Sequence, residues 1–520
     1  MLFNLNWLSQ KIKKGKISIL IILNGILNSQ AQEKPNIVLF LVDDMGWQDT
    51  SVPFASGQTV LKQKYHTPNM QRLAERGMKF TNAYATPVCS PTRVSLMTGL
   101  NAAHHRVTNW TFKKNQLVDE KDSILTPPHW NVNGMSPVDS IPRTVYATPL
   151  PTLLKKQGYF TIHIGKAHFG AIDTPAENPL NIGFDVNVGG HAAGSPSTYL
   201  GEKNYGNAKG LYSPPWGVPN LEEFHGMKVF LTEALTQKAI EALNQPIQEK
   251  KPFFLYMSHY AVHVPLDKDD RFLQKYLDKG LDAEEAKYAA LVEGMDKSLG
   301  DIMDFLEKKN LEENTVIIFM SDNGGLALSP PRGGEAFTQN APLKSGKGSL
   351  YEGGIRVPMI VKWPNLIEPK SESSQYIMIE DFFPTILEIS GLKNYESVQE
   401  IDGISFFPLF KNSALKNDYR KLIWHFPHKW IPTDAPGINY KSAIRQGDWK
   451  LIYDMKSEKK ELYNLKKDIG EENDLSQKYP ETVNHLSQLL GEQLEKWNSQ
   501  MPFNEIKNKV VPYPHQVLND

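Results

Sequence analysis

The stretch that decides the fold is IVLFLVDD, residues 37–44, in which an unbroken apolar run leads into two adjacent aspartates. Such a run predicts a parallel β-strand buried on both faces. Asp43 and Asp44 then stand at the carboxyl end of the strand, where neighbouring carboxylates repel each other unless a cation or several hydrogen-bond donors neutralise them. A turn or helix cap is the alternative for an isolated pair, and a metal site is favoured if a second strand brings further ligands.

A second strand of this kind lies far downstream. Residues 316–320, VIIFM, are followed after one serine by Asp322 and Asn323. Carboxylate and amide oxygens suit a hard divalent ion, calcium before magnesium, and do not suit zinc. The sequence therefore predicts a calcium site formed by Asp43, Asp44, Asp322 and Asn323.

Two more apolar segments have the same layout. Residues 159–164 lead into Lys166 and His168, and residues 252–257 lead into the segment that carries His263. A lone lysine or histidine at a strand end is usually a solvated side chain. In an open parallel sheet, however, ligands bind beyond the carboxyl ends of the strands, so the convergence of these side chains at one edge favours a functional site.

The chain contains one cysteine, Cys89, in the run CSPTR at residues 89–93. A lone thiol cannot form an internal disulfide, so its role is packing or chemistry. Pro91 suits the first turn of a helix and Ser90 or Cys89 can cap it, which places Cys89 at a helix N-terminus that attracts anions. A small buried hydrophobic residue is the alternative.

These motifs, together with SLMTG at residues 95–99, follow the order found in type I sulfatases, the formylglycine-dependent family of the alkaline phosphatase superfamily. The chain resembles this family from about residue 35 to its C-terminus, and among its members it resembles secreted bacterial carbohydrate sulfatases. One departure is visible, because the common Gly-Lys-Trp-His-Leu is replaced by GKAHF at residues 165–169. The lysine and the histidine are kept, so the change concerns the pocket wall.

The resemblance implies that Cys89 is oxidised to formylglycine by a formylglycine-generating or radical maturation enzyme. The hydrated aldehyde would join the calcium ligands and attack the sulfur of a sulfate ester. Its second hydroxyl would then allow release of sulfate by elimination, a route that a simple serine lacks.

The family also supplies roles for five other positions. Arg93 orients the diol, and Lys166 and Lys347 neutralise charge on the sulfate oxygens. His263 protonates the leaving alcohol, and His168 accepts the proton that is lost when sulfate is released.

Lys347 belongs to the segment LKSGKGSLYEGGIRVP at residues 343–358, which matches neither a Walker loop nor a dinucleotide fingerprint. It resembles the stretch that brings a lysine to the sulfate. Lys344 is a less favoured substitute, and Glu352 and Arg356 are interpreted as structural.

The pattern predicts an α/β fold with a large, mostly parallel sheet between helices, followed by a smaller C-terminal subdomain. Amphipathic helices are expected over residues 70–76, 152–157, 231–243 and 284–309. Short antiparallel strands over residues 443–453 and 460–465 and a helix over 481–497 are expected near the C-terminus. The predicted domains are residues 32–410, catalytic, and 411–520, an α+β subdomain.

The N-terminus has the layout of a secretory signal peptide, residues 1–31, with lysines followed by an apolar stretch too short to span a membrane. We therefore expect export to the periplasm or the extracellular space. With 22% charged residues and a net charge of −1, the composition gives no support for a nucleic-acid partner.

Long segments over residues 101–143 and 189–219 carry aromatic and histidine side chains that suit a sugar ring. We expect a sulfated carbohydrate as substrate, bound by His104, His105, Trp110, His191 and Arg332. A phosphate or phosphonate ester hydrolase of the same superfamily is one alternative, and a noncatalytic sulfated-glycan binding protein is another.

Overall fold

The structure is a computed structural model that describes residues 34–55, 64–327, 340–432 and 435–517. Its larger part is built on a mixed sheet with the strand order β11-β2-β10-β9-β1-β8-β6-β7, in which β12 also pairs with β2. The strands are β1 (Asn36–Val42), β2 (Met78–Tyr84), β6 (Phe160–Gly165), β7 (Val186–Val188), β8 (Phe253–Ser258), β9 (Thr315–Ser321), β10 (Arg356–Lys362), β11 (Ser371–Ser373) and β12 (Ile377–Met378).

Strand β1 lies at the centre of this sheet, parallel to both of its neighbours, β8 and β9. Strand β10 is antiparallel to β9 and β2, so the sheet is mostly and not wholly parallel. The sequence did not predict β2, because Lys79 and Asn82 interrupt its apolar pattern and lie only half-buried.

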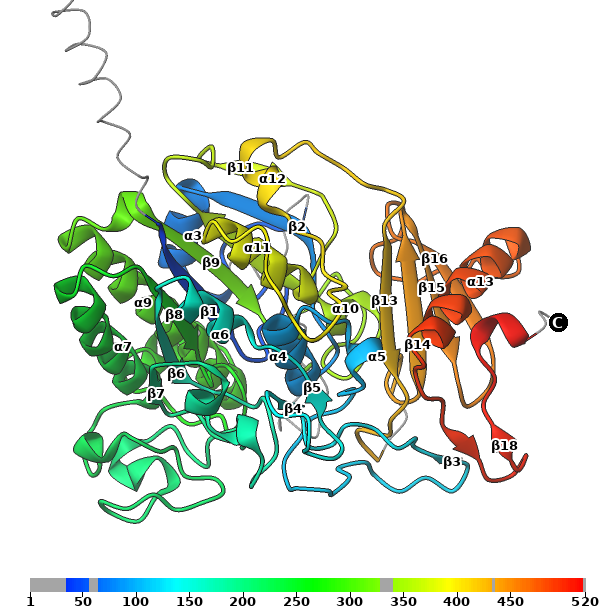
Figure 1. Ribbon diagram of the computed structural model, residues 1–520, viewed down its shortest axis with the longest axis horizontal. Coiled ribbons are helices and arrows are strands. Elements are labelled where there is room, and N and C mark those ends of the chain that lie inside the picture. Colours follow the sequence, from blue (N-terminus) through cyan, green and yellow to red (C-terminus); the bar gives the residue numbers. More distant parts are fainter. Residues whose placement is uncertain (1–33, 56–63, 328–339, 433–434, 518–520) are drawn as a thin grey trace, which may run out of the picture.

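Helices cover both faces of the sheet, as Figure 1 shows. Val38, Phe40 and Val42 of β1 belong to the core on one face, and Ile37, Leu39 and Leu41 belong to the core on the other. The first core is completed by α3 (Pro68–Glu75), α7 (Leu231–Gln248) and α9 (Ala283–Lys308), and the second by α4 (Cys89–Thr98), α6 (Leu150–Lys156) and α11 (Phe382–Ile389).

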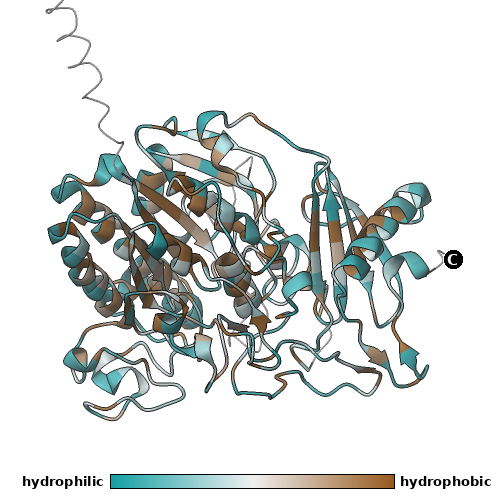
Figure 2. Cartoon of the chain, viewed as in Figure 1, coloured by the Kyte–Doolittle hydropathy of each residue, from teal (hydrophilic) through white to brown (hydrophobic). Residues whose placement is uncertain are grey.

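Burial follows the hydropathy of these elements. Figure 2 shows the strands of the large sheet predominantly brown, with teal on the outward faces of the helices. The expected apolar face of α9 is buried, from Tyr288 to Leu306. The predicted α/β class is therefore confirmed.

The C-terminal part is an antiparallel sheet in the order β13-β14-β15-β16. Its strands are β13 (Lys421–Phe426), β14 (Lys441–Gln446), β15 (Trp449–Asp454) and β16 (Lys460–Asn464). Helix α13 (Pro480–Lys496) packs on one face through Leu486 and Leu490. The other face packs against the large part of the molecule, where Trp424 meets Tyr84. The predicted subdomain of antiparallel strands and a helix is confirmed.

A buried charged cluster joins the two parts. Glu352, the first residue of α10 (Glu352–Ile355), accepts hydrogen bonds from Lys450 of β15 at 2.9 Å and from the Tyr84 hydroxyl at 2.7 Å. Lys450 also pairs with Glu471 at 2.8 Å, and all three charged side chains are fully buried. Burial alone would raise the pKa of Glu352, but Lys450 and two arginines hold it below its usual range. Glu352 thus has a structural role, as expected, because it joins the two parts of the molecule.

The predicted domain boundary after residue 410 lies at the end of α12 (Phe407–Lys411), ten residues before β13 begins. The expected signal peptide, residues 1–31, lies outside the described residues, and so does Arg332. Among the described helices, none combines the length and the apolar character that crossing a membrane requires.

Candidate active site

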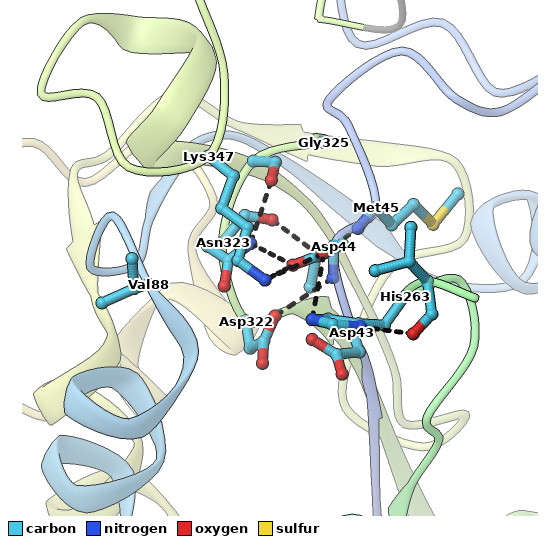
Figure 3. A network of polar contacts seen from close by, with 12 residues as sticks. Asp43, Asp44, Met45, Val88, His263, Asp322, Asn323, Gly325 and Lys347 are labelled. Carbon is cyan, nitrogen blue, oxygen red and sulfur yellow. Dashed lines mark hydrogen bonds and ion pairs between the residues drawn. The ribbon is translucent and has the colours of Figure 1, made fainter. Parts of the chain in front are cut away.

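The carboxyl ends of four neighbouring strands deliver the predicted side chains to one edge of the sheet. Asp43 and Asp44 directly follow β1, and Asp322 and Asn323 directly follow β9. Lys166 follows β6 directly. Figure 3 shows the aspartates and Asn323 gathered around one point, with Lys347 and His263 beside them.

Each of the three aspartates is paired with a buried cation from another part of the chain. The pairs are Lys166 Nζ with Asp43 Oδ2 at 2.6 Å, Lys347 Nζ with Asp44 Oδ1 at 2.7 Å, and Arg93 Nη2 with Asp322 Oδ2 at 2.7 Å. Paired charges of this kind are strongly destabilised when one partner is removed. The sequence motifs therefore depend on one another for their stability as well as for their chemistry.

Two oxygens of this cluster lack a hydrogen-bond partner among the described residues. They are Oδ1 of Asp43 and Oδ1 of Asn323, and both are fully buried. Asn323 donates through Nδ2 to Asp44 at 2.7 Å, which leaves its oxygen free to accept. Buried acceptors are normally satisfied, and a hard cation takes such oxygens as ligands. The donor set therefore fits a calcium ion.

His263 adds a nitrogen to the same group, which sequence reasoning did not assign to the metal. Ligand atoms of Asp43, Asp44 and His263 all lie within 4.8 Å of one another. The His263 Nε2 atom lies 3.6 Å from Oδ2 of Asp44.

The electrostatics of the two adjacent aspartates differ. Burial and the neighbouring Asp322 raise the pKa of Asp43 well above its usual value. Burial would also raise the pKa of Asp44, but Lys347 and His263 hold it below the usual range. A cation bound between the carboxylates would relieve the repulsion that acts on Asp43.

Cys89 lies at the N-terminus of α4, as expected, with Pro91 in the first turn. The expected cap is wrong, because Val88 is the N-cap residue and no side chain caps the helix. Ser90 Oγ instead accepts a hydrogen bond from the backbone N–H of Thr111 at 3.0 Å. Burial raises the pKa of the Cys89 thiol, so the unmodified side chain is a poor nucleophile.

Hydrogen bonds to backbone carbonyls fix the tautomers of the two histidines. Nε2 of His168 lies 2.7 Å from the carbonyl oxygen of Thr111, and Nδ1 of His263 lies 2.7 Å from that of Val264. A carbonyl can only accept, so these nitrogens carry the protons. Burial lowers the pKa of both rings, to about 3 for His263. The lone pairs are therefore on Nδ1 of His168 and on Nε2 of His263.

A cavity of about 270 Å³ opens onto this cluster. It is lined by Cys89, Lys347, His168 and His263, together with Val88, Trp110, Val118, Glu120, Gly194, Ser195, Trp216, Val264, Leu326 and Trp430. Of the predicted substrate-binding residues, the structure brings only Trp110 to the cavity wall in the part of the chain that it describes.

The three predicted histidines have other contacts. His104 pairs with Asp402 at 2.8 Å and stacks on Trp497. His105 is buried and contacts the Ser95 hydroxyl at 3.0 Å, and His191 contacts the Tyr212 hydroxyl at 3.3 Å. None of the three lines the cavity.

Sequence reasoning did not select Glu120 and Trp430, which line the cavity. Trp430 follows β13 in the C-terminal part, so no spacing relates it to the catalytic motifs. The residues altered in the GKAHF motif, Ala167 and Phe169, are buried in the core and do not themselves line the cavity.

Comparisons with known proteins agree with this geometry. A family model described as Sulfatase matches residues 35–392, and one described as N-sulphoglucosamine sulphohydrolase, C-terminal, matches residues 346–500. A "Sulfatase" of Formosa agariphila is 33% identical over 86% of both chains. The "N-acetylgalactosamine-6-sulfatase" of Mus musculus is 29% identical over 94% of this chain and 91% of its own.

Solved structures show the same fold. "Ps i-CgsB" is 28% identical and superposes with a TM-score of 0.70 over 90% of this chain and 94% of its own. A second structure of Ps i-CgsB, in complex with k-i-k-neocarrahexaose, gives a TM-score of 0.69. The family match over the larger part and the cluster of strand-end residues lead to one conclusion: the chain belongs to the sulfatase family and is a sulfuric ester hydrolase.

Proposed function

We propose that the protein hydrolyses a sulfate ester on a sugar, using a formylglycine made from Cys89 and a calcium ion held by Asp43, Asp44, Asp322 and Asn323. The observation that carries this proposal is the position of Cys89. It begins α4 and lines the same cavity as Lys347 and both histidines.

When they are present, formylglycine supplies a hydrated carbonyl carbon and calcium supplies charge that acidifies its hydroxyl. The remaining functions belong to side chains. Lys166 donates a hydrogen bond to Asp43, and Lys347 donates to Asp44. An ammonium group has three N–H donors, so both lysines can also bind the sulfate oxygens. Arg93 holds Asp322 through Nε and Nη2, at 3.0 and 2.7 Å, and so fixes one predicted ligand.

The histidines act through opposite ring atoms. With Nδ1 bonded to Val264, His263 exchanges protons through Nε2: this atom must first take up a proton, which the negative charge of a bound sulfate ester would favour, and then passes it to the leaving alcohol. With Nε2 bonded to Thr111, His168 accepts a proton at Nδ1, which has no partner among the described residues. These are the roles that the resemblance implies: His263 protonates the leaving alcohol, and His168 accepts the proton that is lost when sulfate is released.

A sugar sulfate is the substrate class best supported. The tryptophans Trp110, Trp216 and Trp430 line the cavity, and aromatic faces suit the apolar faces of sugar rings. Two of the relatives described above, by their printed names, act on or bind carbohydrates. We further propose that residues 1–31 direct export to the periplasm or the extracellular space, and that a maturation enzyme modifies Cys89.

The test combines mass spectrometry with paired substrates. The peptide that contains Cys89 should show thiol replaced by aldehyde, and Cys89→Ala should lose at least about a thousandfold in kcat while keeping the wild-type melting temperature within a few degrees. Sulfate esters should be hydrolysed faster than matched phosphate esters. An active preparation with wholly unmodified cysteine, or a preference for phosphate, contradicts the proposal.

A further inference from the structure

One part of the cavity wall has no role in the chemistry described so far. Trp110 and Glu120 belong to one segment and Trp430 to another that is far away in the sequence, yet all three line the cavity. A buried contact chain joins these segments: Nδ1 of His428 lies 2.7 Å from Asp119 Oδ1, and Nε2 lies 2.6 Å from the Thr108 hydroxyl.

This contact chain holds the backbone around Glu120. The imidazole of His428 is fully buried, and the Asp119 side chain is 4% exposed. The Glu120 N–H donates to the carbonyl oxygen of Lys429 at 2.9 Å. Glu120 and Trp430 are therefore held in a fixed relation to each other.

Trp430 also links this wall to the catalytic cluster. Its ring lies against Gly348, where a β-carbon would come within 2.2 Å of the ring, and Gly348 follows Lys347. A shift of the wall would therefore disturb the lysine that faces the sulfate.

The carboxylate of Glu120 is unusual in this cavity. It is exposed and makes no hydrogen bond or ion pair with another residue in the described part of the chain. Lys429, whose carbonyl oxygen accepts from the Glu120 N–H, and Lys456 are both paired through Nζ with Asp122, at 2.9 and 3.2 Å. A pocket that binds an anion through Lys347 thus carries an unpaired negative charge on its wall.

We propose that Glu120 determines substrate specificity. It accepts a hydrogen bond from a hydroxyl or amide N–H of the sugar that bears the scissile sulfate, and it excludes a second sulfate or a carboxylate on that sugar. This inference rests on the proposed function, because it concerns the leaving group of the same reaction.

The size of the effect follows from Coulomb's law. If the Glu120 carboxylate and a second anionic group on the sugar are about 6 Å apart at an effective dielectric constant near 40, their repulsion lowers the affinity of the site for that sugar by about tenfold. An unpaired polar group on a site wall also rejects a ligand that cannot hydrogen-bond to it. Charge and hydrogen bonding can be separated, because glutamine keeps an acceptor oxygen and removes only the charge.

The experiment measures competitive inhibition of 4-methylumbelliferyl sulfate hydrolysis by N-acetylgalactosamine 6-sulfate and by N-acetylgalactosamine 4,6-disulfate. In the wild type, we expect the disulfated sugar to bind more weakly. In Glu120→Gln, its inhibition constant should fall by about tenfold relative to that of the monosulfated sugar. In Glu120→Ala, the monosulfated sugar should also bind more weakly, because the acceptor is lost.

The matched control is Glu481→Gln, which removes an exposed carboxylate on α13, outside the cavity. It should leave both inhibition constants unchanged. An equal ratio of the two constants in wild type and Glu120→Gln overturns the inference, as does the absence of inhibition by the monosulfated sugar. Failure of the wild type to hydrolyse any sulfate ester, on an aryl group or on a sugar, would instead overturn the proposed function.

Discussion

Gly194 lies directly against the imidazole of His168, so that a β-carbon at position 194 would come within 2.3 Å of Cε1 and 2.6 Å of Nδ1. The Nδ1 atom is the one that carries the lone pair, because Nε2 donates to Thr111. Glycine at this position therefore leaves the basic atom of the ring accessible to a proton donor.

Gly194→Ala should displace the His168 ring and lower kcat/KM by about tenfold to a hundredfold, since misplacing a catalytic group by about 1 Å has effects of that size. Steady-state kinetics on a sulfate ester is the measurement. In a His168→Ala background the same substitution should cause little further loss, because the ring is gone. Full additivity of the two losses would show that Gly194 acts elsewhere.

The purified protein should contain about one equivalent of calcium, and chelation should lower its melting temperature together with its activity. A ligand bound only by the folded state at 100 to 1,000 times its Kd stabilises that state by about 3–4 kcal/mol. Asp43→Asn should lose both calcium and activity, as measured by elemental analysis and turnover. Asp304→Asn is the control, because Asp304 is 62% exposed on α9. One equivalent of zinc, with activity that survives chelation, would contradict the assignment.

The two histidines should differ in their dependence on the leaving group. His263→Ala should lose most activity on a sugar sulfate and much less on an aryl sulfate, whose phenolate departs without protonation. His168→Ala should impair both substrates alike, and with the aryl sulfate it should accumulate a sulfated enzyme that mass spectrometry detects. If the losses for His263→Ala are equal across leaving groups, the general acid is Lys347.

Asp296 of α9 should make stability depend on pH. It accepts hydrogen bonds from the backbone N–H groups of Asn69 and Met70, at 3.0 and 2.7 Å, and burial raises its pKa to about 6 despite these donors. A pKa above the unfolded value of 3.8 favours the protonated folded form, so the contribution of Asp296 to stability is present at low pH and is lost as the pH rises from 3.8 through about 6.

Urea unfolding of the wild type and Asp296→Asn between pH 4 and 7 tests this expectation. The asparagine cannot ionise, so the difference in unfolding free energy between the two proteins should change with pH over this window. The variant should also lose about 1–3 kcal/mol at low pH, because an amide nitrogen replaces one accepting oxygen. A difference that stays constant with pH would exclude the titration of Asp296.

The sequence predicted that the strand-end residues lie together, because their geometry follows from one rule. Parallel strands end at the same edge, so the residues after β1, β6 and β9 had to meet. The cavity wall could not be predicted in this way. His104 contacts Asp402 and His105 contacts Ser95, so neither side chain faces the cavity. Trp430 lines the cavity because the C-terminal sheet packs against the large part of the molecule.

Glu352 ties the C-terminal sheet to the large sheet through fully buried charges. Separating the two parts would expose apolar surface and would also leave Glu352 and Lys450 without partners in a low-dielectric interior. We therefore expect that neither part folds alone and that calorimetry records one cooperative transition across the predicted boundary. Trp430, which the C-terminal part contributes to the cavity wall, is thus coupled to the folding of the whole chain.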